Sequence, residues 1–194
     1  IEIIPKKIVE KLSGDENFQL NLASPCKQIT FNGSDAHLSI NGKNHVTSHV
    51  ISTLPSFTLA KLIEHQHPKL AAELKKIKYV DVAVINLLYK KEDLLPLKGF
   101  GALVAPSENL PILGIIFDSC ITDCDGNTVL TVMSGGKWFD KFYSGDSSNQ
   151  HLLNVALENI KKILKIEEKP DISEVYLNRQ CIPQYTVGHH KRIE

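Results

Sequence analysis

Residues 27–52 read KQITFNGSDAHLSINGKNHVTSHVIS and carry the clearest pattern of secondary structure in the chain. Three runs of strand-forming residues lie within this stretch: 27–31, 36–40 and 44–52. They are joined by Asn32-Gly33 and Asn41-Gly42, and Asn-Gly favours the positive φ angles of a tight hairpin turn. The stretch therefore predicts a three-stranded antiparallel β-meander.

Helices are expected on both sides of this meander. Pro5 suits the first turn of a helix that opens the chain, because its missing N–H costs nothing there. The apolar face of that helix would be formed by Ile4, Ile8 and Leu12. After the meander, residues 57–64 and 68–77 have the spacing of two short helices.

The second half of the chain predicts a further sheet and a long helix. Its apolar strand-like runs are 80–89, 100–104, 112–117, 129–133 and 175–177. The first of these, VDVAVINLLY, is rich in β-branched residues and is expected to be buried on both faces in its second half. Residues 148–165 have helical periodicity, with Ser148 or Asn149 available as N-cap. The fold class is mixed α/β (α+β), with at least two sheet regions.

Composition excludes some classes of protein. The 194 residues include 22 basic and 22 acidic side chains, so there is no basic surplus to neutralise phosphates, and no nucleic-acid partner is expected. No uncharged apolar run approaches the roughly 20 residues that span a bilayer. The 4 cysteines are too sparse for a disulfide scaffold, and reduced thiols are expected.

A self-contained active site is not visible in the sequence. There is no glycine-rich phosphate loop, nucleophile elbow or paired-histidine zinc motif. Asp123 and Asp125 begin like a calcium loop, but Ser134 stands where its closing acidic residue should be. We therefore predict no metal site, and the catalytic residues are unknown.

One apolar cluster is unusual. In GFGALVAP (99–106), two glycines flank Phe100, which allows the backbone to approach another group closely. An ordinary glycine-containing core strand would explain the cluster equally well. Met133, the only methionine, ends another apolar strand.

Six stretches, read in order, resemble the protoporphyrinogen oxidase family of FAD-dependent enzymes. They are HVISTLP (49–55), VDVAVINLLY (80–89), GFGALVAPSE (99–108), LGIIFDS (113–119), TVMSGGKW (131–138) and CIPQYTVGH (181–189). The resemblance implies the amine-oxidase flavoprotein fold. Residues 1–55 and 176–194 would belong to a FAD-binding domain, and residues 56–175 to a substrate-binding domain. Family members are more than twice as long, so the chain is expected to be a middle-to-late fragment.

The resemblance also implies functional residues. Those matching the family's tetrapyrrole pocket are Phe100, Gly101, Leu103, Ile116 and Met133. A flat, apolar macrocycle needs such a wide hydrophobic slot. Cys26 matches a segment whose backbone contacts the adenine end of FAD, where Val is usual. Asn178 stands where related flavoproteins often carry Trp near the flavin.

The implied reaction is oxidation of protoporphyrinogen IX to protoporphyrin IX, in haem biosynthesis. It would use FAD as cofactor and molecular oxygen as the final oxidant. The resemblance further implies the mitochondrial inner membrane, association with it through a region outside these residues, and a homodimer as one option.

Two alternatives remain open. The chain could be a non-catalytic porphyrin-binding or interaction module that retains the sheet. It could also belong to another flavoenzyme of the amine-oxidase fold, although GFGALVAP and CIPQYTVGH would then be unexplained.

Overall fold

A computed structural model of the chain describes residues 2–194. The chain divides into two compact units, the first reaching Ile77 and the second running from Lys78 to Glu194.

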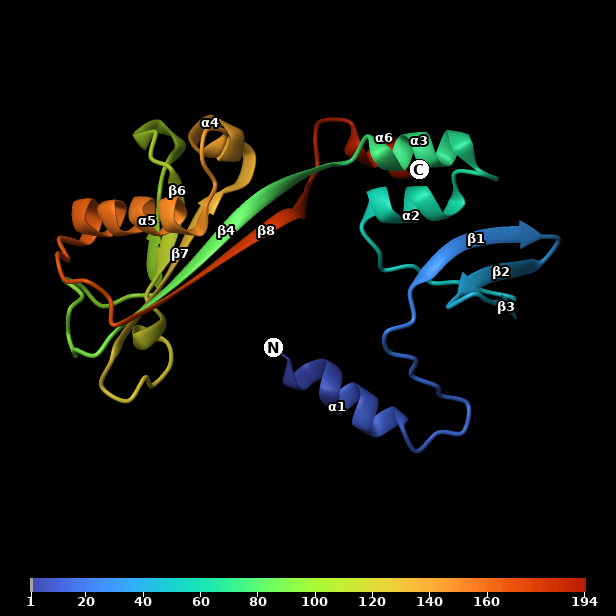
Figure 1. Cartoon of the computed structure of the whole chain (residues 1–194), viewed down its shortest axis with the longest axis horizontal. Helices are drawn as coiled ribbons and strands as arrows, with labels where there is room; N and C mark the ends of the chain where they lie inside the picture. Colours follow the sequence, from blue (N-terminus) through green and yellow to red (C-terminus); the bar gives the residue numbers. More distant parts are fainter. Residues whose placement is uncertain (1) are drawn as a thin grey trace. The chain divides into compact units, whose positions relative to one another are not determined.

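The first unit contains the predicted meander and the three predicted helices (Figure 1). Its elements are α1 (Ile3–Leu12), β1 (Cys26–Asn32), β2 (Asp35–Ile40), β3 (Lys43–Thr47), α2 (Ser56–Ile63) and α3 (Pro68–Lys75). The strands form one antiparallel sheet in the order β1-β2-β3. The third strand ends at Thr47, so the prediction that it extends to Ser52 was wrong.

The two hairpins use different turn residues. Asn41 and Gly42 have φ angles of 50° and 76°, and Ile40 pairs with Lys43 around them. This is the predicted Asn-Gly turn, in which both central residues need positive φ. In the first hairpin Asn32 still pairs with Asp35, so the turn is Gly33-Ser34, with φ of 63° at Gly33. A glycine at the first central position is typical of the alternative hairpin turn.

A small apolar core joins the meander to the helices of the first unit. Its buried members are Ile29, Ala60, Leu62, Ile63 and Ala71. The helix α1 contributes no buried residue, so its apolar stripe of Ile4, Ile8 and Leu12 is exposed. Since α2 packs against β1, residues 56–75 belong to the compact unit of the meander. The division into a FAD-binding domain (residues 1–55 and 176–194) and a substrate-binding domain (residues 56–175) stays a prediction.

The second unit is a five-stranded antiparallel sheet with helices. Its strands are β4 (Lys78–Tyr89), β5 (Gly101–Leu103), β6 (Ile112–Ile116), β7 (Thr128–Gly135) and β8 (Ile172–Gln184). They lie in the order β5-β6-β7-β4-β8. Its helices are α4 (Phe139–Tyr143), α5 (Asn149–Leu164) and α6 (His189–Ile193), with short 3₁₀ turns η1 (Pro106–Glu108), η2 (Asp118–Cys120) and η3 (Gly136–Trp138).

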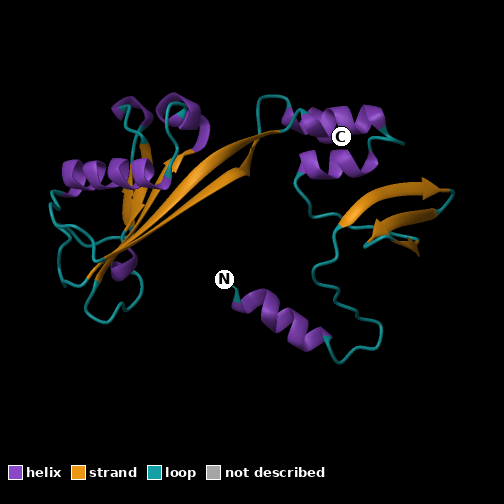
Figure 2. Cartoon of the chain, viewed as in Figure 1, coloured by secondary structure: helices purple, strands orange, loops and turns teal. Residues whose placement is uncertain are grey.

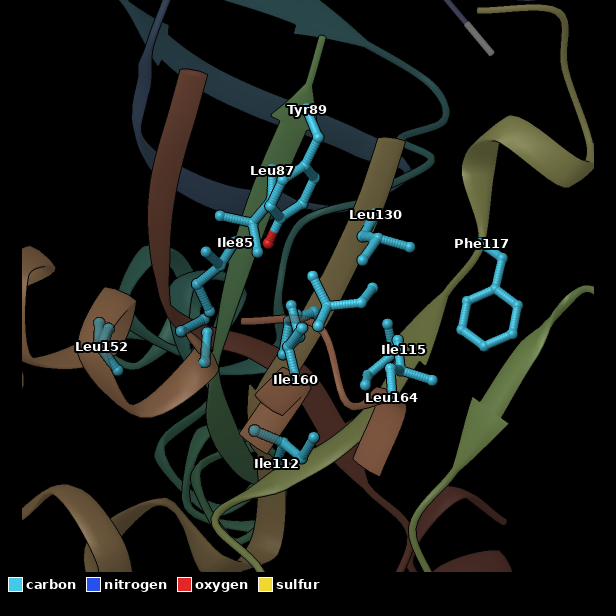
Figure 3. Packing of buried hydrophobic residues seen from close by; sticks show 14 of the residues in the cluster. Ile85, Leu87, Tyr89, Ile112, Ile115, Phe117, Leu130, Leu152, Ile160 and Leu164 are labelled. Atoms are coloured by element: carbon cyan, nitrogen blue, oxygen red, sulfur yellow. The ribbon is translucent and has the colours of Figure 1, made fainter. Parts of the chain in front are cut away.

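One face of this sheet carries the core of the second unit. Along β4, Ile85, Leu87 and Tyr89 are at most 1% exposed, whereas Asn86 and Leu88 are half-buried. The strand therefore alternates, and the prediction that its second half is buried on both faces was wrong. The buried face packs against an apolar stripe of α5: Leu152, Ala156, Ile160 and Leu164. Figure 3 shows Leu152, Ile160 and Leu164 of this stripe together with labelled side chains of β4 and β6.

The long strand β8 departs most from the sequence prediction, which placed a strand only at residues 175–177. It pairs with β4 from Ile172 to Gln184, and the two strands run alongside each other in Figure 2. Pro183 has no backbone N–H to donate to a neighbouring strand. It is tolerated here because β8 is an edge strand with a partner, β4, on one side only.

Candidate functional site

The candidate site is the face of the five-stranded sheet opposite α5. Side chains alternate along each strand, and directly paired residues of neighbouring strands share a face. The pairings place Leu103 opposite Gly114, Gly114 opposite Met133, and Met133 opposite Val84. Val84 in turn pairs with Tyr176, so one row crosses all five strands. We call this surface the open face.

A second row of the open face lies two residues further along each strand. It contains Gly101, Ile116, Thr131, Asn86 and Glu174, again one from each strand. A third row is formed by Val129, Leu88 and Ile172. The open face is thus largely apolar.

Its side chains are more accessible than those on the α5 side. Leu103 is 96% exposed, Tyr176 53% and Met133 37%, whereas Ile115 and Val132 on the other face are at most 2% exposed. The open face is therefore an accessible apolar surface backed by a rigid, packed sheet, which suits the binding of a flat apolar ligand.

Four of the five predicted substrate residues come together on this face. Gly101 and Leu103 come from β5, Ile116 from β6 and Met133 from β7. They approach one another only because the hairpin of β5 and β6 pairs with β7. The sequence resemblance grouped these residues, and the strand register provides the physical basis for the grouping.

Phe100 occupies a different position. Its carbonyl oxygen accepts a hydrogen bond of 3.0 Å from the Phe117 amide, but its side chain is 81% exposed. It lines a hollow of about 450 Å³ between residues 92–100 and the loop 119–128. The strand pairings therefore do not include Phe100 in the rows of the open face, and its side chain lines this loop hollow.

The glycines of β5 and β6 allow the two backbones to approach closely. A Cβ atom on Gly101 would collide with the carbonyl oxygen of Ile115, and Gly101 also has a φ of 152°. A Cβ on Gly114 would lie 2.6 Å from the carbonyl oxygen of Ala102. Both glycines are thus required by the hairpin itself, which explains part of the GFGALVAP cluster without a ligand.

The two predicted cofactor residues lie in different compact units. Cys26 begins β1, and its thiol donates to the Gln28 carbonyl oxygen at 3.3 Å. A register shift between Cys26 and Gln28 leaves Lys27 without a partner in β2, so backbone groups there are compatible with contact to a cofactor. Asn178 is exposed on β8, and its amide donates to the Tyr176 carbonyl oxygen at 3.3 Å.

Sequence reasoning missed two polar pairs in the second unit. The Thr131 hydroxyl donates to Oδ1 of Asn86 at 2.9 Å, on the open face. Arg179 donates to the Asp81 carboxylate at 2.6 Å, at a bulge between β4 and β8. Neither pair has a sequence signal, because its members are 45 and 98 positions apart and are joined only by strand pairing.

Two buried tyrosines have raised pKa values, but on the core side of the sheet. Burial raises the pKa of Tyr89 to about 12, with a further contribution from the charge of Glu168. Burial also raises the pKa of Tyr143, whose hydroxyl donates to the Pro111 carbonyl oxygen at 2.9 Å. Since both side chains lie in the hydrophobic core, neither is a candidate acid or base for the open face.

The described residues contain neither a metal-binding cluster nor a candidate membrane span. Within residues 2–194, no three His, Cys, Asp or Glu side chains gather in a way that could hold a metal ion. No helix in that range is long and apolar enough to cross a membrane.

Several curated relatives of the chain are named protoporphyrinogen oxidase. Protoporphyrinogen oxidase of Homo sapiens is 37% identical over 163 residues, which cover 81% of this chain and 34% of the relative. Protoporphyrinogen oxidase of Schizosaccharomyces pombe is 31% identical over 197 residues, covering 100% of this chain and 38% of the relative. No family model matches the chain.

Solved structures share the fold. An Exiguobacterium protein, named as a candidate protoporphyrinogen oxidase, superposes with a TM-score of 0.76 at 20% identity, over 97% of this chain and 41% of that one. Cyclohexylamine oxidase from Brevibacterium oxydans gives a TM-score of 0.70 at 14% identity, over 90% and 38%.

The chain spans about a third of the length of the curated relatives it matches. Its mixed α/β architecture, with antiparallel sheets of three and five strands, is similar to that of FAD-dependent amine-oxidase-fold proteins. Fold and sequence together identify the chain as a homologue of the protoporphyrinogen oxidases, matching them over that third of their length.

Proposed function

We propose that this chain forms the substrate-binding sheet and part of the FAD-binding domain of a flavin-dependent protoporphyrinogen oxidase. The observation that carries the proposal is the open face. Gly101, Leu103, Ile116 and Met133, predicted from sequence as tetrapyrrole-binding residues, lie together on one accessible apolar surface. The homology to protoporphyrinogen oxidases supports the same activity.

The residues of the open face would bind and orient the substrate. Leu103 and Met133 would offer apolar contact to one side of the macrocycle. Water would be displaced from the surface where ligand and apolar side chains meet.

FAD, when bound, would supply the hydride acceptor for three two-electron oxidations of protoporphyrinogen IX, with oxygen consumed and hydrogen peroxide released. This chain would contribute backbone groups near Cys26 and the side chain of Asn178 to the surroundings of FAD. In that assignment residues 1–55 and 176–194 serve the cofactor, and residues 56–175 serve the substrate. We assign no acid or base to the described residues.

The cellular setting follows from the same proposal. A protoporphyrinogen oxidase of this kind would act in haem biosynthesis at the mitochondrial inner membrane. Membrane attachment would use a region outside residues 1–194, and the enzyme could assemble as a homodimer.

The test uses the full gene product that contains this chain. We expect it to purify with flavin absorbance and to convert protoporphyrinogen IX into fluorescent protoporphyrin IX with uptake of oxygen. Leu103→Asn should raise KM for protoporphyrinogen IX, since Leu103 is exposed on the open face. Leu22→Asn is the matched control, because Leu22 is 76% exposed in the other compact unit.

Other outcomes would support the alternatives. Porphyrin binding without flavin or turnover would favour a non-catalytic module. Flavin binding with oxidation of an amine and no reaction with protoporphyrinogen IX would favour another amine-oxidase-fold enzyme, and would overturn the proposal.

A further inference from the structure

A polar pair stands in the middle of the open face. Asn86 on β4 and Thr131 on β7 are direct cross-strand partners, and the Thr131 hydroxyl donates to Asn86 Oδ1 at 2.9 Å. Both side chains are half-buried. A hydrogen bond between two side chains of a sheet fixes their orientation relative to the strands.

Apolar side chains surround this pair on most sides. Val84 and Leu88 flank Asn86 along β4, and Val129 and Met133 flank Thr131 along β7. On the next strand, Ile116 pairs with Thr131. The two polar groups therefore form a small polar island within an apolar surface.

The Asn86 amide keeps unused hydrogen-bonding capacity. An asparagine amide has two N–H donors and two acceptor lone pairs, and Thr131 uses one lone pair. Within residues 2–194, the Nδ2 group of Asn86 has no hydrogen-bond partner. The amide can thus both donate to and accept from a ligand.

The charge beside the pair restricts which ligand group can approach. Glu174 is exposed on β8 and pairs directly with Asn86. Its carboxylate would repel a ligand carboxylate placed over Asn86, whereas an uncharged N–H group would be accepted there. A ligand that has uncharged N–H groups at its centre and holds its carboxylates at its edge, away from Glu174, matches this arrangement.

We propose that Asn86, oriented by Thr131, is a specificity-determining residue that hydrogen-bonds to the central ring nitrogens of a tetrapyrrole bound on the open face. The inference rests on the proposed function. A porphyrinogen presents pyrrole N–H donors at its centre, and a porphyrin presents both N–H donors and imine acceptors. The free donor and acceptor capacity of Asn86 fits both oxidation states.

The experiment compares two probes that differ only at the macrocycle centre. Protoporphyrin IX has free central nitrogens, whereas in zinc protoporphyrin IX the metal occupies them, and both carry the same periphery. Binding is measured by Soret and fluorescence titration of the full gene product loaded with FAD. We expect Asn86→Leu to weaken protoporphyrin IX binding by roughly tenfold and zinc protoporphyrin binding by less than about twofold.

Two further variants complete the design. Thr131→Val keeps the shape of the side chain and removes the hydroxyl that donates to Asn86. It should weaken the binding of protoporphyrin IX by about threefold, and the binding of zinc protoporphyrin IX by less. It decides the question if Asn86→Leu does not fold. Asn154→Leu makes the matched substitution at an exposed site on α5, and should change neither titration.

The outcomes separate this inference from the proposed function. Equal weakening of both porphyrins, or no weakening of either, would overturn the role of Asn86 while leaving the open face as a tetrapyrrole surface. If the unmodified protein binds neither porphyrin, the proposed function fails and the role of Asn86 fails with it.

Discussion

Asp81 and Arg179 hold together the point where β4 and β8 fall out of register. Nη1 of Arg179 lies 2.6 Å from Oδ2 of Asp81. The other carboxylate oxygen, Oδ1, accepts a hydrogen bond of 2.7 Å from the backbone N–H of Gln180. Gln180 has a φ of 45°, which is unusual for a residue other than glycine. The guanidinium also donates to Ser147 at 2.8 Å and lies 5.2 Å from the centre of the Phe139 ring. The Asp81 carboxylate thus accepts the Gln180 backbone N–H at the bulge, and Arg179 connects the bulge to the region before α5.

We predict that Asp81→Ala lowers the free energy of unfolding by more than Arg179→Ala does. The Asp81 side chain is 19% exposed and accepts two hydrogen bonds, so its loss also leaves the Gln180 amide unpaired. We expect a decrease of about 1–2 kcal/mol in unfolding free energy for Asp81→Ala. For Arg179→Ala, with a side chain 55% exposed, less than about 1 kcal/mol is expected.

Urea unfolding followed by the fluorescence of Trp138, the only tryptophan, measures both variants within the second unit. Lys91→Ala is the control, because its ion pair with Glu168 is exposed on both sides. Equal costs for Asp81→Ala and Arg179→Ala would mean that the bulge does not depend on the carboxylate.

Gly101→Ala should disrupt the pairing of β5 with β6. The added Cβ would meet the Ile115 backbone, which cannot move aside as a side chain can, and a φ of 152° is strained for alanine. We expect Gly101→Ala to lower the free energy of unfolding by about 1–3 kcal/mol. Gly145→Ala is the matched control, since nothing lies within 4 Å of its added Cβ.

Amide hydrogen exchange at Phe117 provides the local readout for these glycine variants. Its amide donates to the Phe100 carbonyl oxygen at 3.0 Å, at the end of the β5–β6 ladder. Faster exchange there in Gly101→Ala, but not in Gly145→Ala, is the expected result. Unchanged protection would contradict the close approach of the two strands.

Tyr89→Phe should weaken the dependence of stability on alkaline pH. Burial raises the folded-state pKa of Tyr89 from 10.0 to about 12, so the folded protein holds this proton more tightly than the unfolded chain. Its contribution is complete below about pH 10 and is lost as the pH rises toward about 12. Tyr143 acts in the same direction, so the variant removes only part of the slope.

At neutral pH the same variant should be neutral or slightly stabilising. The Tyr89 hydroxyl is buried and has no hydrogen-bond partner among residues 2–194, so its removal relieves an unsatisfied polar group. Unfolding free energies between pH 8 and pH 11 test both statements, with Tyr185→Phe, 73% exposed, as control. An unchanged alkaline slope in Tyr89→Phe would contradict the buried environment of the hydroxyl.

Elements with a local signal could be predicted from the sequence. Asn41-Gly42 forms the expected turn, and α5 begins after Ser148, whose hydroxyl accepts the His151 amide at 3.3 Å. Each signal acts within a few residues, through backbone conformation or a helix cap. The strand β8 could not be predicted beyond residues 175–177, because its polar outer half is held by backbone pairing with β4 and not by side-chain burial.

The candidate site was predictable only in part, for the same reason. The resemblance grouped Leu103 and Met133, but it also included Phe100, whose side chain lines the loop hollow instead. Asn86 and Thr131 carry no sequence signal, since a one-residue change in the β4–β7 register would separate them. Long-range register decides which residues meet on the open face.

The two faces of the β5–β6 hairpin differ sharply in burial. Leu103 on β5 is 96% exposed, whereas Ile115 on β6 is 2% exposed in the core of the second unit. Leu103→Asn should change the unfolding free energy by less than about 0.5 kcal/mol, because it removes almost no buried contact. Ile115→Asn should cost about 3 kcal/mol or more, since it buries an unpaired amide and leaves a cavity. Binding should show the reverse order. Leu103→Asn should weaken the binding of protoporphyrin IX, whereas the folded fraction of Ile115→Asn should bind protoporphyrin IX as the unmodified protein does. If Leu103→Asn were strongly destabilising, the open face would be packed against another part of the protein and could not receive a ligand.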